Sequence, residues 1–159
     1  MKKLILFFAL AIVASSCKTP APAAATNVDR KSQVAIKGNW TITSVTYTGS
    51  NMFKITSFDL ADSKCFEGST WKFISNNDSG DMALTQANCT SFASKIKWYV
   101  NKDGQFVLKF LAEGVKAKKM QQGYILKVAD QTAESFKLID NINIGGKMTN
   151  IVYQFNKSN

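Results

Sequence analysis

The 159-residue chain contains no histidine. Histidine is the usual general base of hydrolases and the most common zinc ligand, so its absence excludes Ser-His and Cys-His catalytic pairs and histidine-based metal sites. We therefore expect a protein that is not an enzyme, with no catalytic residue, metal site or cofactor.

Proline, cysteine and acidic residues are also scarce. The chain has two prolines, Pro20 and Pro22, and three cysteines, Cys17, Cys65 and Cys89. Its 20 lysines and arginines outnumber 11 acidic residues, which gives a formal net charge of +9. The basic residues are spread along the chain, so the charge fits either an ordinary solvated surface or a domain close to anionic headgroups.

The N-terminal stretch has the three parts of a secretory signal. Met1-Lys2-Lys3 is followed by an apolar run from Leu4 to Val13 and by the small residues Ala14-Ser15-Ser16 before Cys17. This order of charge, apolar run and small residues is typical of exported proteins. Export also argues against a nucleic-acid partner.

The four residues Ala14-Ser15-Ser16-Cys17 resemble a bacterial lipobox. The resemblance implies that residues 1–16 are a lipoprotein signal peptide and that Cys17 receives a diacylglyceryl group and an amide-linked acyl chain such as palmitate. Lys18 is not an acidic retention-type residue, which favours the outer membrane. The alternative is an ordinary signal peptide cut nearby, with Cys17 left as a free thiol.

Residues 17–35 are predicted to be a flexible tether. The stretch contains both prolines, many alanines and no alternating strand pattern, and no amphipathic face indicates a helix. As a flexible coil of about 20 residues it would hold the following domain on the order of 25 Å from the membrane.

The remaining two cysteines, Cys65 and Cys89, are predicted to form a disulfide, because an oxidising compartment lets thiols pair. The bond would close a loop of about 25 residues and contribute roughly 3 kcal/mol by restricting the unfolded chain. Its role would be structural.

From residue 36 onward, short segments alternate apolar and polar side chains and are separated by turn residues. The clearest is 94–100, in which Ile96, Trp98 and Val100 share one face, and Asn101-Lys102-Asp103-Gly104 then predicts a hairpin turn. Residues 49–60 have no clean period and predict a short helix or a packed loop. The segments predicted as strands are 36–47, 69–75, 81–87, 94–100, 106–110, 123–130, 135–140 and 147–156.

Eight short strands with hairpin-length links predict an all-β fold, an eight-stranded antiparallel up-and-down barrel formed by residues 36–159. Closure removes the exposed edges of such a meander. A barrel of this size is either packed solid or holds one small ligand, and the sequence leaves both alternatives open.

Gly38-Asn39-Trp40 on the first strand matches the Gly-x-Trp pattern of lipocalins, and Cys65, Trp71 and Phe73 follow in the next segment. Together with the lipobox, these residues resemble the lipocalin-like lipoproteins of Gram-negative bacteria. The resemblance covers residue 36 to the C-terminus and implies a barrel whose first-strand tryptophan packs across the closed end. The arginine that stacks on this tryptophan in many lipocalins has no counterpart here.

The inward-facing aromatic residues are the candidate ligand-binding set, since they could line a cavity for an apolar molecule. They could equally fill the barrel. The candidates are Trp71, Phe73, Trp98, Phe106, Phe110, Tyr124, Phe136 and Tyr153.

Three other patterns predict less. Residues 76–81 resemble a calcium loop but lack its final acidic residue, so a hairpin turn is expected. The carboxylates that a hydrolase would need have no spacing that pairs them. A loop with Lys116, Lys118 and Lys119, joined by Lys95 and Lys97, could grip anionic headgroups but fits a solvated loop better. The carboxylates considered are Asp59, Glu67, Asp81 and Glu113.

These features predict a lipid-anchored protein of the bacterial envelope, attached through Cys17, whose barrel binds a small apolar or amphipathic ligand without catalysis. The alternative is a packed barrel that acts as a protein-interaction or envelope-structural module. A carboxylate hydrolase is the weakest of the three hypotheses.

Overall fold

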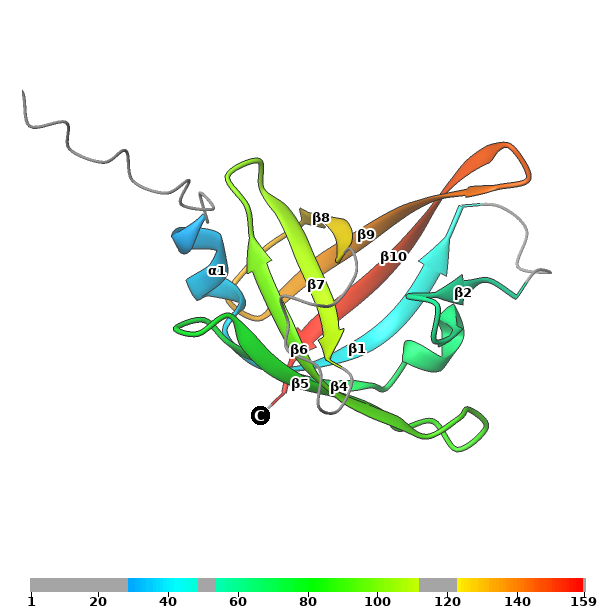
Figure 1. Cartoon of the computed structure of the whole chain (residues 1–159), viewed down its shortest axis with the longest axis horizontal. Helices are drawn as coiled ribbons and strands as arrows, with labels where there is room; N and C mark the ends of the chain where they lie inside the picture. The colour runs from blue at the N-terminus through cyan, green and yellow to red at the C-terminus, as the bar shows by residue number, and fades with distance from the viewer. Residues whose placement is uncertain (1–28, 49–53, 112–122, 159) are drawn as a thin grey trace, which may run out of the picture.

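The computed structural model describes residues 29–48, 54–111 and 123–158. Most of these residues belong to a closed antiparallel barrel, which confirms the predicted fold class. Its strands are β1 (Gly38–Tyr47), β4 (Thr70–Ile74), β5 (Ser79–Leu84), β6 (Phe92–Val100), β7 (Gln105–Leu111), β8 (Tyr124–Ala129), β9 (Ser135–Ile144) and β10 (Lys147–Lys157). Around the barrel their order is β1-β10-β9-β8-β7-β6-β5-β4, so β1 pairs with both β10 and β4 (Figure 1).

The alternation of the sequence decides which side chains face the interior. On β6, Ile96, Trp98 and Val100 are fully buried, whereas the residues between them are partly exposed. β10 repeats the pattern with Ile151, Tyr153 and Phe155. Since side chains alternate along a strand, the buried set of every strand points into one common core.

The hairpins are set by turn residues. Between β6 and β7, the Asn101 carboxamide oxygen accepts from the Asp103 and Gln105 amides at 3.0 and 2.9 Å, and Gly104 has a φ of 73°. The strand predicted to end at residue 140 is longer than expected, because β9 runs on to Ile144 and pairs with β10 as far as the Gly145-Gly146 turn.

A short helix, α1 (Arg30–Ile36), occupies the last six residues of the predicted tether and Ile36, which was predicted to begin the first strand. The Asp29 carboxylate caps it by accepting from the Lys31 and Ser32 amides at 3.1 and 3.3 Å. Its buried residues are Gln33 and Ile36. Because the helix is short and one of these two residues is polar, the sequence has no amphipathic stripe that would predict it. In the described part of the chain, no helix is long and apolar enough to cross a membrane.

Between β1 and β4 the chain forms a small hairpin, β2 (Thr56–Ser57) with β3 (Ala61–Asp62), followed by the 3-10 helix η1 (Ser63–Phe66). The predicted Cys65–Cys89 disulfide is present, with the Cα atoms 5.7 Å apart. It ties η1 to the loop that follows β5. Figure 1 shows this hairpin and α1 at opposite ends of the barrel. We call the α1 end the closed end and the other the mouth.

Gly80 on β5 occupies a position where the barrel wall leaves no room for a side chain. A Cβ atom there would lie 2.0 Å from the Lys72 carbonyl oxygen on β4 and 3.1 Å from Ile96 Cγ1. Gly80 lies in the predicted 76–81 turn, but in the structure it pairs with Phe73 inside the sheet. The glycine thus lets the Ile96 side chain pack close to the β5 backbone.

Gly80→Ala is expected to lower the free energy of unfolding by about 1–3 kcal/mol, because the new methyl group overpacks the wall. Thermal and denaturant unfolding of the oxidised protein measure this loss. Gly104→Ala is the control: it has no atom within 4 Å but a positive φ, and it should cost about 1 kcal/mol. A smaller loss for Gly80→Ala than for Gly104→Ala would contradict the packing argument.

Candidate functional site

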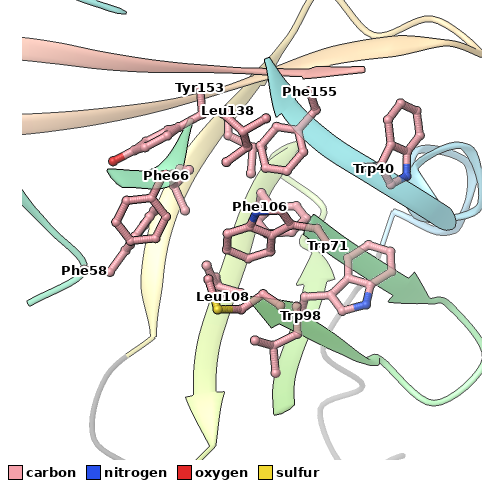
Figure 2. Packing of buried hydrophobic residues seen from close by; sticks show 14 of the residues in the cluster. Trp40, Phe58, Phe66, Trp71, Trp98, Phe106, Leu108, Leu138, Tyr153 and Phe155 are labelled. Carbon is pink, nitrogen blue, oxygen red and sulfur yellow. The ribbon is translucent and has the colours of Figure 1, made fainter. Parts of the chain in front are cut away.

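The eight aromatic side chains predicted to bind ligand all lie on barrel strands and face the interior. All are buried except Tyr124, which is half-buried. Their ring contacts divide them into two groups along the barrel. One group packs into the core near the closed end, and the other gathers at the mouth; Figure 2 labels Trp98 and Phe106 of the first group and Tyr153 of the second.

The first group is a continuous stack of rings. Trp98 stacks on Phe106 with their ring centroids 5.6 Å apart. The centroid of Phe73 lies 5.0 Å from that of Trp98 and 5.6 Å from that of Phe106. Phe136 stacks on Phe155 at 4.5 Å. The faces and edges of these rings are used in packing, so this half of the barrel forms a floor beneath the mouth.

At the closed end, Trp40 completes this floor. Its indole nitrogen donates to the Ile36 carbonyl of α1 at 2.7 Å, and its ring meets the edge of Phe136 at 4.7 Å. The Gly-x-Trp motif therefore joins the first strand to the helix that covers this end.

The second group surrounds a ring that is not among the eight predicted residues. Phe58, in the turn between β2 and β3, is 5% exposed. It stacks on Tyr153 at 5.4 Å and contacts Tyr124 at 5.1 Å and Phe110 at 5.7 Å. Residues 55–62, which we call the lid, thus insert an aromatic side chain into the mouth from outside the barrel wall.

Trp71, the remaining candidate, lies between the two groups. Its ring is 6.0 Å from Phe73 on the floor side and 6.3 Å from Phe110 on the mouth side. Its indole nitrogen donates to Ser69 Oγ at 2.9 Å.

Two phenols hold the lid down. Tyr124 Oη donates to the Phe58 carbonyl oxygen at 2.7 Å and lies 3.1 Å from Asp59 Oδ2. Tyr153 Oη bonds to Ser57 Oγ at 2.6 Å. Phe58 and Asp59 have φ values of 55° and 52°, a backbone region that costs residues other than glycine roughly 1–2 kcal/mol each. The phenol contacts offset this strain.

Asp140 contributes a carboxylate to the same region. It follows Phe136 and Leu138 on the inward side of β9, pairs with Ile151 on β10 and is half-buried. Burial raises the pKa of its carboxyl group, and a hydrogen bond from the Asn141 amide opposes the rise. No ion pair between described residues includes Asp140.

The phenols at the mouth stay protonated. Burial, the hydrogen bond with Asp59 and the charges of Asp59 and Asp140 raise the pKa of Tyr124 to about 12. Burial is also the main cause of the raised pKa of Tyr153, and Asp140 adds to it. Both hydroxyls therefore remain hydrogen-bond donors over the physiological range.

Among the described residues, the calcium-like loop and the candidate carboxylates do not form a metal or carboxylate-pair site. The described residues include no group of three or more acidic or cysteine side chains placed to hold a metal ion. Residues 76–78 form the expected hairpin turn, and Asp81 is paired with Lys95. Glu67 is bonded to Lys64 and to the Val45 amide. Glu113, the 116–119 loop and Cys17 lie outside the described residues.

A separate cleft of about 580 Å³ lies at the closed end, between α1 and residues 131–133. Three lysines from distant parts of the sequence contribute to it, and only Lys157 has an ion-pair partner among the described residues, Glu134 at 3.8 Å. The lysines are Lys31, Lys37 and Lys157.

Several solved structures of bovine odorant-binding protein are similar to this chain at low identity. The complex with a selenium-containing odorant has a TM-score of 0.45 and 12% identity, over 80% of this chain and 73% of that chain. The complex with its natural ligand has a TM-score of 0.44 and 13% identity, over 79% of this chain and 72% of that chain. The chain matches no protein-family model and no curated protein. At this similarity the assignment of the fold rests on the strand pairing of the chain itself.

Ionisation of Asp140 is expected to destabilise the protein as the pH rises. Because burial raises its pKa, the folded state holds the proton more tightly than the unfolded chain does. The stability that this proton provides is complete below the ordinary value of 3.8 and is lost as the pH rises through the folded pKa. Asp140→Asn should therefore raise the thermal midpoint at neutral pH, by a few degrees at most since the group is partly solvated.

Thermal unfolding across the acidic and neutral range tests this expectation. Below the ordinary aspartate pKa, the parent protein and Asp140→Asn should have similar midpoints, because both carry a neutral side chain there. An equal difference at all pH values would show that the effect comes from packing and not from ionisation.

Proposed function

We propose that the protein is a lipoprotein of the bacterial envelope, anchored through acyl chains on Cys17, whose barrel binds a small apolar or amphipathic molecule at the mouth. The observation that best supports ligand binding is Phe58. An aromatic ring from outside the wall fills the space between Tyr124, Tyr153 and Phe110. A ligand would take the place of this ring when the lid moves away.

The contacts of the lid are suited to reversible opening. Its turn has two consecutive residues with positive φ, and its polar anchors are hydrogen bonds that water can replace. Lifting the lid relieves the backbone strain and exposes the Phe58 ring to water. These opposing costs favour a closed lid whose opening requires only modest energy.

The floor limits what enters. Phe73, Trp98 and Phe106 are already packed against one another, so the ligand would occupy the mouth and not the full length of the barrel. An apolar part would contact Phe110 and Tyr153, and a polar part would lie towards Asp140. The amphipathic class of ligand is therefore favoured over a purely apolar one.

The leader supports the anchor. Two or three acyl chains, each buried methylene worth roughly 0.8 kcal/mol, would make attachment at Cys17 effectively permanent. By resemblance to known sorting rules, Lys18 favours the outer membrane.

A packed barrel that binds a protein is the second candidate, and two observations favour it. First, Phe58 packs the lid against the rings of the mouth. Second, two large apolar side chains are exposed near the tip of the β9–β10 hairpin. Ile144 is 39% and Met148 is 55% exposed. Exposed apolar side chains at a protruding tip are typical of protein contacts.

Acylation of Cys17 is expected to be detected as an increase in the mass of the N-terminal peptide. Protein extracted from its own cells should begin at Cys17 and carry two or three acyl chains. Cys17→Ala should lose these chains and be released from the membrane fraction. An unmodified cysteine, or unchanged membrane association of Cys17→Ala, would contradict the anchor without affecting the argument about the mouth.

Ligand binding is expected to be detected by native mass spectrometry as a small molecule retained by protein from its own cells. Phe58→Ala should bind the neutral apolar probe N-phenyl-naphthylamine several-fold more tightly than the parent protein, because the ring no longer competes for the mouth. Leu60→Ala is the matched control, since it removes a 37% exposed side chain from the same lid and should not change binding.

If the parent protein retains no small molecule and Phe58→Ala binds no probe, the barrel is packed and the second candidate is favoured. Crosslinking in intact cells would then be expected to capture a protein at the β9–β10 tip. Met148→Gln should reduce that capture.

A further inference from the structure

The mouth contains a half-buried carboxylate, Asp140, that has no ion-pair partner among the described residues. The chain has a net charge of +9, and five ion pairs link described residues elsewhere on the surface. Asp140, by contrast, faces the interior of the barrel without a cation among the described residues. Among the described residues, its carboxylate accepts a hydrogen bond from the amide of its neighbour Asn141.

Among the described residues, two phenols lie near Asp140, and neither can neutralise it. The two phenols whose pKa values its charge raises, Tyr124 and Tyr153, already donate their protons to the lid. Asp59, which contacts Tyr124 on the lid, adds a second negative charge. Two described lysines flank the lid in the chain: Lys64 is bonded to Glu67 at 2.9 Å, and Lys54 is exposed to solvent.

The aromatic rings of the mouth favour the same sign of charge as Asp140. The face of a tyrosine or phenylalanine ring attracts a cation within about 6 Å, typically by 0.5–2 kcal/mol. The rings of Tyr124 and Tyr153 both border the Phe58 ring, with centroids 5.1 and 5.4 Å from it, so both would border a group that takes its place. A half-buried carboxylate next to such rings provides both interactions that an alkylammonium group requires.

We propose that the mouth selects a cationic amphiphile, a protonated amine on a short apolar chain. Its ammonium group bonds to Asp140, and its chain replaces the Phe58 ring against Phe110 and Tyr153. The inference rests on the proposed ligand-binding function and names the class of ligand. An anionic amphiphile of the same length, such as a fatty acid, is repelled by Asp140 and by Asp59.

The test compares two ligands that differ only in the charged group. The purified full chain is titrated at neutral pH with octylamine and with octanoate, each below its micelle concentration, and binding is followed by calorimetry. Octylamine is expected to bind at least about tenfold more tightly than octanoate, as the loss of one partner from a partly buried charge pair implies. The preference should weaken at high salt concentration.

Variants assign the preference to one carboxylate. Asp140→Asn should reduce octylamine affinity about tenfold and raise octanoate affinity, whereas Asp140→Glu should keep the preference for the amine. Asp103→Asn, in the exposed β6–β7 turn, makes the same change of charge far from the lid and should behave as the parent protein does. Thermal unfolding checks that each variant is folded.

The outcomes separate this inference from the function on which it rests. If neither amphiphile binds and Phe58→Ala binds none either, the ligand-binding function itself is wrong. If octanoate binds as well as octylamine, or if Asp140→Asn keeps the preference for the amine, the barrel binds ligands but the selection of a cation is wrong.

Discussion

The pairing of β1 with strands on both of its edges is the constraint on which the structure depends. Trp40 lies opposite Lys157 of β10 and opposite Trp71 of β4, so one residue connects the two ends of the meander. Without either pairing the sheet would have two open edges and its aromatic face would be exposed to water. Closure is what turns alternating side chains into a common interior, and it also places the lid, which follows β1 in the chain, over the mouth.

The closed barrel then divides its aromatic residues by function. Rings near α1 have ring neighbours on several sides and act as core. Those at the mouth contact Phe58, which lies in the strained turn between β2 and β3. The rings near α1 are packed by side chains of the barrel wall itself, whereas those at the mouth are packed by Phe58, which comes from outside the wall. Asp140 lies two residues beyond Leu138 on β9, at the mouth and not in the packed floor, so a carboxylate can occupy this inward position.

Much of this could be predicted from local sequence. Residues such as Ile96, Trp98 and Val100 alternate so regularly that strand and inward face follow directly, and two spare cysteines in an exported chain indicate their pairing. Phe58 was missed because its positive φ breaks the period of two, and α1 because a polar residue, Gln33, is one of its buried contacts. Asp140 had a usable signal: it continues the i, i+2 series of Phe136 and Leu138 at the end of a predicted strand. Its isolation from cations required the spatial arrangement.

The position of α1 has a consequence for the direction in which the barrel faces. The described chain begins at Asp29, whose amide donates to the Val100 carbonyl, so the chain enters the barrel at the closed end, opposite the lid. A tether from Cys17 would bring this end, with the cleft that Lys31, Lys37 and Lys157 line, nearest to the phosphates of the bilayer. The mouth would then open away from the membrane, and an amphiphile would reach it from the aqueous compartment without first being extracted from the lipid.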